Sequence, residues 1–90
     1  MKTNELRTGD ILRVDYSDFG RPVVYYVVMN DIAVSFRGDV NCGNRPSGWL
    51  DLKTIDICEY CDAVYRAKHC GDIFNGDFEN ERIYDCIWRA

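Results

Sequence analysis

The sequence predicts a mainly β fold, built as one small barrel of five to six antiparallel strands. Apolar and polar residues alternate over short segments, β-branched and aromatic residues fill the longest apolar run, and Gly, Pro, Asn and Asp separate the segments. The chain has 90 residues, which is enough for a single domain spanning 1–90 and too few for two. Because 47% of the residues are hydrophobic, we expect the chain to fold rather than stay disordered.

The first half of the chain contains three expected strands. After a turn at 8–10, apolar residues alternate with Arg13 and Asp15, which is the period of a half-buried strand. The apolar run that follows lacks such alternation, so it suits a central strand covered on both faces. A tight turn at 30–31 then joins this run to a further alternating segment, which predicts a hairpin. The expected strands of this half are 12–16, 23–29 and 32–37.

The second half is less regular, and two conformations remain open for residues 54–70. Either Thr54 caps a helix that runs through this segment, or a loop is followed by a strand at 63–67. Gly, Pro, Asn and acidic residues predict loops at 38–48 and 71–81. The remaining expected strands are 49–52 and 83–88.

Strands of this number and length, connected by hairpin turns, suggest an SH3-like barrel. Closure into a barrel would hide the edges of strands that are as apolar as these. A short helix within 54–70 is compatible with this architecture.

The net charge of −4 is placed unevenly along the chain. Residues 1–50 carry six acidic and six basic residues, whereas residues 51–90 carry nine acidic and five basic residues and therefore the whole excess. An acidic surface repels the phosphate backbone, so we expect no direct binding to duplex DNA. Such a surface suits a basic protein partner, including the nucleic-acid groove of an enzyme.

The sequence gives no sign of export or of a membrane segment. The N-terminal residues lack the apolar region of a signal peptide, and no apolar run reaches the length that crosses a bilayer. We therefore expect a cytoplasmic protein in a reducing compartment, where cysteines are free or bound to metal. The odd count of five cysteines fits disulfide pairing poorly.

Short motifs of structural residues lie at 6–12, 26–30, 48–52, 64–66 and 79–89. In this order they resemble the motifs of a set of small SH3-like proteins encoded by phages and prophages of Firmicutes. The resemblance implies an accessory protein of phage origin, a class that includes inhibitors of host defence and, among them, anti-CRISPR proteins that act on type II, Cas9-type effectors. It also favours the strand at 63–67 over the helix.

The cysteines carry the clearest chemical signal, because Cys58 and Cys61 form a Cys-x-x-Cys pair that can grip one zinc ion. If 62–67 and 83–88 pair antiparallel, Cys86 falls near the Cys61 end, and Cys42 in its Gly-rich loop can close the site. The predicted ligands of a structural zinc are Cys42, Cys58, Cys61 and Cys86, with His69 or Cys70 as substitutes.

Two other interpretations of the cysteines stay open. Free cysteines are common small core residues, and Cys86 alternates with apolar neighbours in the way such a residue would. A redox pair is disfavoured, because Asp56, Glu59 and Asp62 surround the motif and their charge would raise the thiol pKa.

The acidic residues of the C-terminal segment are the candidate partner-binding residues. Their ordinary role is a solvated face, and the functional hypothesis is an electrostatic patch that docks on Lys and Arg. Nearby aromatic residues, including Phe78, either anchor such a partner or pack into the core. The candidate residues are Asp72, Asp77, Glu79, Glu81 and Asp85.

No catalytic constellation is apparent, since His69 is the only histidine and it has no recognisable partner in the sequence. The first hypothesis is therefore a non-enzymatic inhibitor, a zinc-stabilised acidic module that occludes a basic nucleic-acid-binding surface of a Cas9-type nuclease. The alternative is a nucleic-acid- or nucleotide-binding barrel in which arginines cluster on one face and aromatic rings stack on bases. The residues of this alternative are Arg7, Arg13, Arg21, Arg37 and Arg45, with Tyr25, Tyr26 or Trp49.

Overall fold

The computed structural model describes residues 1–37, 45–72 and 75–90 and contains six antiparallel strands, so the predicted mainly β fold is confirmed. One short helix, α1, spans Ile57–Tyr60, and three 3-10 turns lie at Thr3–Glu5 (η1), Ser17–Phe19 (η2) and Cys70–Asp72 (η3). No helix in the described ranges is long and apolar enough to cross a membrane. The strands are β1 Ile11–Val14, β2 Val24–Met29, β3 Ile32–Arg37, β4 Arg45–Asp51, β5 Ala63–Ala67 and β6 Tyr84–Arg89.

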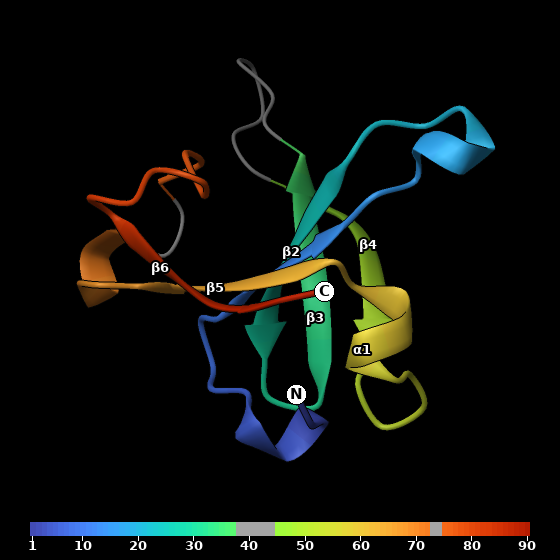
Figure 1. Ribbon diagram of the computed structural model, residues 1–90, viewed down its shortest axis with the longest axis horizontal. Coiled ribbons are helices and arrows are strands. Elements are labelled where there is room, and N and C mark those ends of the chain that lie inside the picture. The colour runs from blue at the N-terminus through green and yellow to red at the C-terminus, as the bar shows by residue number, and fades with distance from the viewer. Residues whose placement is uncertain (38–44, 73–74) are drawn as a thin grey trace.

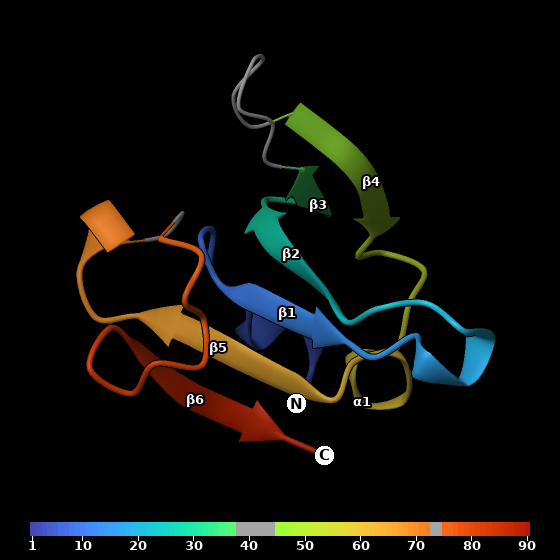
Figure 2. The same cartoon turned by 90° about the horizontal axis from the view of Figure 1, so that it is seen from above.

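The strands form a single sheet in the order β4-β3-β2-β1-β5-β6. The sheet curls, so that β5 and β6 cross in front of β2 and β3 (Figure 1), while the view from above separates β2, β3 and β4 from the layer of β1, β5 and β6 (Figure 2). The result is a barrel-like sheet whose two edge strands are β4 and β6. Helix α1 lies between β4 and β5 in the chain and covers one open end.

The main core fills the inside of this curl. It is made by alternate residues of the strands, including Leu12 and Val64, which are fully buried, and by Ile57 from α1. A second apolar cluster lies on the other face of the sheet, where Tyr84 is buried and the rings of Tyr25 and Phe78 are 4.9 Å apart. Residues 26–28 of β2 are buried in succession, which confirms the prediction of a central strand covered on both faces.

The β2–β3 hairpin is confirmed, with Met29 paired to Ile32 across a two-residue turn. Asn30 has a φ of 68°, a conformation that asparagine adopts more readily than most residues. The first strand ends earlier than expected, at Val14 rather than at residue 16. The Asp15 carboxylate accepts a hydrogen bond from the Ser17 N–H at 2.8 Å, which turns the chain into η2.

Residues 54–70 contain a short helix followed by a strand. The Asp56 carboxylate accepts a hydrogen bond from the Cys58 N–H and caps α1, which ends after Tyr60. Strand β5 follows, so the strand at 63–67 and a short helix are confirmed, and a helix running from Thr54 through the segment is wrong. The predicted loop at 38–48 is wrong for 45–48, because pairing with β3 draws these residues into β4.

A tight turn joins the N-terminal residues to the sheet. The Asp10 N–H donates to the Arg7 carbonyl at 3.0 Å, and Gly9 between them has a φ of 96°. Two backbone bonds of 2.8 Å, from Gly9 to Val28 and from Val28 to Asp10, fasten the turn to β2. A residue with a side chain rarely adopts this φ, so the turn depends on glycine at position 9.

We expect Gly9→Ala to lower the free energy of unfolding by about 1–2 kcal/mol, because the new Cβ would be strained at a positive φ. Urea unfolding measures this difference. Gly71→Ala is the matched control, since Gly71 has no positive φ and a Cβ there would meet no heavy atom within 4 Å. Equal stability of the two variants would show that the turn does not need its left-handed residue.

Candidate functional site

The Cys-x-x-Cys motif spans the end of α1, with Cys58 in the helix and Cys61 directly after it, and the two thiols have different surroundings. The Cys58 side chain is exposed, and its Sγ lies 3.1 Å from the N-terminal nitrogen and 3.2 Å from the carbonyl oxygen of Met1. Cys61 is 4% exposed and packs in the main core. Burial, with the charges of Asp62 and Cys58, raises the pKa of the Cys61 thiol to about 12. Without a metal, Cys61 therefore stays a thiol at neutral pH.

The structure does not place Cys86 beside this pair. Strands β5 and β6 pair antiparallel as expected, but Cys86 lies opposite Tyr65, and Arg89 is the residue opposite Ala63. Paired residues share one face of a sheet, so Cys86 lies on the face of Tyr65 and the second cluster, away from the core that holds Cys61. The expected proximity of Cys86 to the Cys61 end is thus wrong.

The zinc set as a whole stays a prediction, because Cys42 lies outside the described residues. His69 and Cys70 are both exposed in the connection between β5 and β6. Within the described part of the chain, no three His, Cys, Asp or Glu side chains are grouped so that they could hold one metal ion. Of the candidate ligands in the described ranges, the structure brings together Cys58 and Cys61 only, and these would be the first two ligands.

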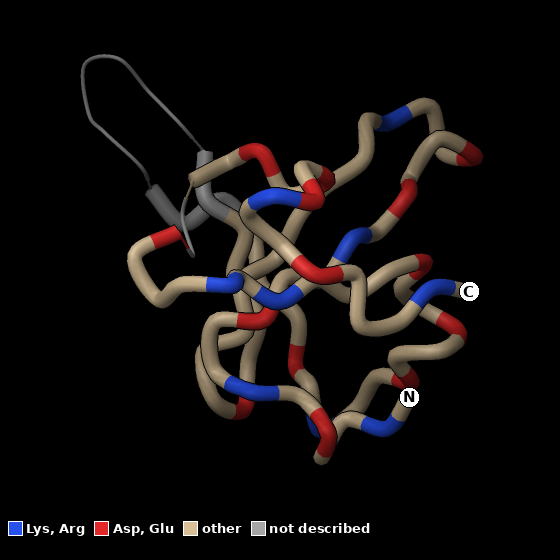
Figure 3. The backbone as a smooth tube through the Cα atoms, turned by 60° about the vertical axis from the view of Figure 1, so that its left-hand side comes forward, with Lys and Arg blue, Asp and Glu red and all other residues tan. Residues whose placement is uncertain are grey.

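Four of the five predicted partner-binding acids lie in the β5–β6 connection and Asp85 lies in β6, and two of the five have basic neighbours. Glu79 Oε1 is 3.3 Å from Arg13 Nε, and Asp85 Oδ1 is 3.6 Å from Lys68 Nζ. The other three, Asp72, Asp77 and Glu81, have no ion pair with a described Lys or Arg. Figure 3 shows acidic and basic residues interspersed along the backbone. The segment therefore does not present a continuous patch of five free carboxylates.

The arginines of the nucleic-acid alternative lie in separate surroundings. Arg13 pairs with Asp62 and Glu79. Arg21 lines a groove with Phe19 and Tyr60, and Arg7 lines a separate pocket near β5. The side chains of the other two, Arg37 and Arg45, are outside the description. Of the proposed stacking rings, Tyr26 is buried, Tyr25 packs on Phe78, and Trp49 is 65% exposed. The described arginines do not form one stacking platform.

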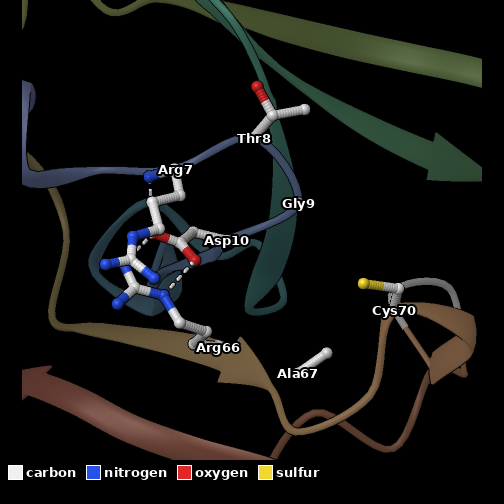
Figure 4. A pocket seen from close by; sticks show the side chains of 7 residues that line it. All are labelled: Arg7, Thr8, Gly9, Asp10, Arg66, Ala67 and Cys70. Atoms are coloured by element: carbon white, nitrogen blue, oxygen red, sulfur yellow. Dashed lines mark hydrogen bonds and ion pairs between the residues drawn. The ribbon is translucent and has the colours of Figure 1, made fainter.

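A pocket of about 200 Å³ lies beside a buried ion pair that the sequence does not predict. Asp10 is 1% exposed, and its two carboxylate oxygens accept hydrogen bonds from Arg66 Nε at 2.9 Å and Nη2 at 2.8 Å. The Arg7 N–H donates to the same carboxylate at 2.8 Å. Figure 4 shows the side chains of Arg7 and Arg66 on one side of the pocket, with Thr8 and Cys70 on the far side.

A wider groove of about 560 Å³ lies between the β1–β2 connection and α1. It is lined by Tyr16, Phe19, Arg21 and Tyr60. Phe19 is 78% exposed and Tyr60 is 41% exposed, although both are large aromatic side chains. The rings of Tyr16 and Tyr60 meet edge to face, with centroids 6.4 Å apart. We call these four residues the aromatic groove.

Three tyrosine hydroxyls link the groove to the core. The Tyr16 oxygen lies 3.0 Å from the Tyr60 oxygen and 2.9 Å from that of Tyr26, which is 7% exposed. The hydrogen bond to Tyr16, together with burial, raises the pKa of Tyr60 to about 12. This direction is the one expected when the Tyr60 hydroxyl donates to Tyr16.

Sequence reasoning missed both concave sites because their members are distant in the chain. Asp10 and Arg66 are separated by 56 positions, and Tyr16 and Tyr60 by 44. The one local signal was Asp10 itself, a charged residue that stands directly before two apolar residues at the start of a strand.

Comparison of the chain with protein-family models, curated proteins and solved structures finds no match.

Elemental analysis of purified, untagged protein tests the zinc prediction. We expect one zinc per chain, a lower melting temperature after chelation, and loss of the metal in Cys58→Ser, because each thiolate ligand contributes to a structural site. Cys86→Ser is the control and should keep the metal, because Cys86 lies opposite Tyr65 on the face of the sheet away from Cys61. A metal-free chain in which Cys58 reacts as an ordinary exposed thiol would contradict the prediction.

The tyrosine chain predicts a pH dependence at high pH. In the folded protein Tyr60 keeps its proton to about 12, whereas an unfolded tyrosine loses it near 10. Between these values the unfolded state binds fewer protons, so the contribution of Tyr60 to stability is lost as the pH rises. Tyr16→Phe removes the hydrogen-bond acceptor and should bring the Tyr60 pKa back towards 10.

Tyrosinate absorbance during an alkaline titration measures this shift. Tyr25→Phe is the control, because Tyr25 lies in the second cluster and has no contact with Tyr60. An unchanged Tyr60 pKa in Tyr16→Phe would mean that burial alone, and not the hydrogen bond, sets it.

Proposed function

We propose that this protein is a non-enzymatic binding module that docks on a basic surface of a protein partner. The observation that carries the proposal is the aromatic groove, where large rings stand open to solvent beside acidic residues. The proposed partner is a nucleic-acid-binding enzyme, and the resemblance to small phage proteins favours a host defence nuclease of the Cas9 type. The proposed place of action is then the host cytoplasm.

The exposure of the rings supports a docking role. A single exposed apolar residue is common, but here Phe19 and Tyr60 border the same concave surface. Aromatic residues supply much of the binding energy in protein interfaces when they become buried. A groove of about 560 Å³ can receive one or two side chains of a partner.

Charges next to the groove favour a basic partner. Asp15 and Asp18 flank Tyr16 and Phe19 in the chain, Glu59 precedes Tyr60, and all three acids are exposed. The hydrogen bond from the Ser17 N–H lowers the pKa of Asp15, which keeps this carboxylate ionised. The groove contains one basic residue, Arg21, beside these three acidic residues. Lys and Arg side chains of a partner, whose alkyl parts can lie on the rings, fit this combination.

The C-terminal acids would act over a longer range. The β5–β6 connection lies at the opposite end of the molecule from η2 and α1 (Figure 1). One flat partner surface would therefore not bury both, and the proposal assigns close contact to the groove. The acids Asp72, Asp77 and Glu81 would steer the approach to a basic surface, an effect on the association rate rather than on the final contact.

The proposed mechanism is occlusion. A nuclease groove that binds nucleic acid is lined with Lys and Arg, which contact phosphates. Carboxylates placed on that groove satisfy the same side chains and leave fewer of them for the nucleic acid. A structural zinc at Cys58 and Cys61 would serve only to hold α1 and its Tyr60 in place.

Competition on a purified Cas9-type nuclease tests the proposal. We expect saturating protein to reduce loading of target DNA, and Phe19→Ala to weaken this inhibition by about tenfold or more, because an anchoring ring is lost. Trp49→Ala is the matched control, since Trp49 is 65% exposed and lies outside the groove. Undiminished DNA loading at saturating protein would contradict occlusion, and equal losses in the two variants would place the contact elsewhere.

The role of the acidic segment is tested by the rates at which the protein associates with and dissociates from the same nuclease. A chain with both Asp77→Asn and Glu81→Gln should associate more slowly with the nuclease and dissociate at an unchanged rate. A faster dissociation would mean that these residues make close contact, contrary to the role proposed for them.

A further inference from the structure

We infer that the pocket beside the Asp10–Arg66 ion pair is a binding site for a phosphate group, held by the guanidinium groups of Arg7 and Arg66. This pocket is separate from the aromatic groove. The proposed ligand is a small anion, either a free phosphate or the phosphate of a small monoester.

The buried carboxylate fixes Arg66 in position. Asp10 is 1% exposed and holds Arg66 through two hydrogen bonds, of 2.9 Å to Nε and 2.8 Å to Nη2. A guanidinium group has five N–H donors, and this bidentate contact uses two of them. Three donors of Arg66 therefore remain, on a side chain that is 30% exposed and cannot rotate freely.

The turn at residues 7–10 brings a second guanidinium to the same place. Its backbone is tied to Asp10 twice, by the Arg7 N–H to the carboxylate and by the Asp10 N–H to the Arg7 carbonyl. The Arg7 side chain lines the same pocket as Arg66 and lies on the same side of it (Figure 4). No carboxylate of the described residues forms an ion pair with Arg7. The charge of Asp10 is paired with Arg66, so the Arg7 guanidinium leaves one positive charge in excess at the pocket.

The pocket thus carries an excess positive charge, although the net charge of the chain is −4. Two like charges that line one pocket repel each other, and an anion bound beside them offsets this repulsion. The planar fork of each guanidinium matches the oxygens of phosphate or carboxylate. Two forks and a net positive charge favour the more highly charged phosphate over a single carboxylate.

The size of the pocket limits the ligand. Its volume is about 200 Å³, and sites for whole small molecules usually measure about 300–1,000 Å³. The pocket therefore admits a phosphate group, and any base or sugar attached to it would remain in solvent. Binding energy should come from the phosphate alone.

Amide chemical shifts during a titration with inorganic phosphate, at constant ionic strength, test this inference on the complete chain. We expect saturable shifts confined to residues 7–10 and 66–70, with a dissociation constant in the millimolar range. Arg7→Ala should weaken binding by about tenfold or more, because charge-assisted hydrogen bonds are lost. The phosphate affinity of Arg7→Lys should lie between those of the unchanged protein and Arg7→Ala, since lysine keeps the charge but lacks the planar fork of donors.

Arg21→Ala is the control for general loss of positive charge, because Arg21 is exposed and lies in the aromatic groove. Its affinity for phosphate should equal that of the unchanged protein. Arg66 is left intact, since its removal would strand the buried Asp10 carboxylate and unfold the site. Absence of saturable shifts, or the same affinity in Arg7→Ala, would overturn the inference.

Adenosine monophosphate and adenosine identify the part of the ligand that is bound. Adenosine monophosphate and inorganic phosphate should bind within a few fold of each other, and adenosine should not bind. Binding of adenosine monophosphate without binding of inorganic phosphate would mean that the base is recognised, which the pocket volume does not allow. That result would overturn the inference as well.

Discussion

The buried carboxylate of Asp10 is the interaction on which the arrangement of this sheet depends. Its side chain accepts hydrogen bonds from Arg66 in β5 and from the Arg7 N–H, while its backbone carbonyl accepts from Val28 in β2. One residue at the start of β1 thereby connects the two strands that flank β1. A buried charge without its partner costs several kcal/mol, so any other register of β1 against β5 is penalised. Apolar residues alone would fill the core but would specify this register less strictly.

The parts of the fold that could be predicted are those whose cause lies within a few residues. Alternation identified the hairpin, and the length and apolar character of residues 23–29 identified the buried central strand. Local capping was misjudged, since Asp56 and not Thr54 begins α1. The early end of β1 also has a local cause, the side-chain hydrogen bond from Asp15 to the Ser17 N–H. Hydrophobic alternation and local side-chain hydrogen bonds compete to set where an element begins and ends. The sequence alone does not show which of the two prevails.

The candidate sites could be predicted far less, because tertiary pairing creates them. The position of Cys86 shows why. The antiparallel pairing of β5 and β6 was expected, but a bulge between Val64 and Tyr65 and the actual register put Arg89 at the end where Cys86 was expected. A shift of this kind moves a ligand to the other face of a sheet. The acidic segment shows the same limit, because Glu79 turns towards Arg13 across a distance that no sequence pattern reveals.

The aromatic groove has one wall that is fixed and one that is free. Tyr60 is held by the chain of hydroxyls that ends at the buried Tyr26, so its ring is ordered before anything enters the groove. Phe19 projects from a 3-10 turn with 78% of its surface exposed and can change its rotamer at little cost. A pre-ordered wall lowers the entropy lost on binding, and an adjustable wall adapts to side chains of different size. In the proposed docking role, the groove would therefore accept partner side chains of different size at similar cost.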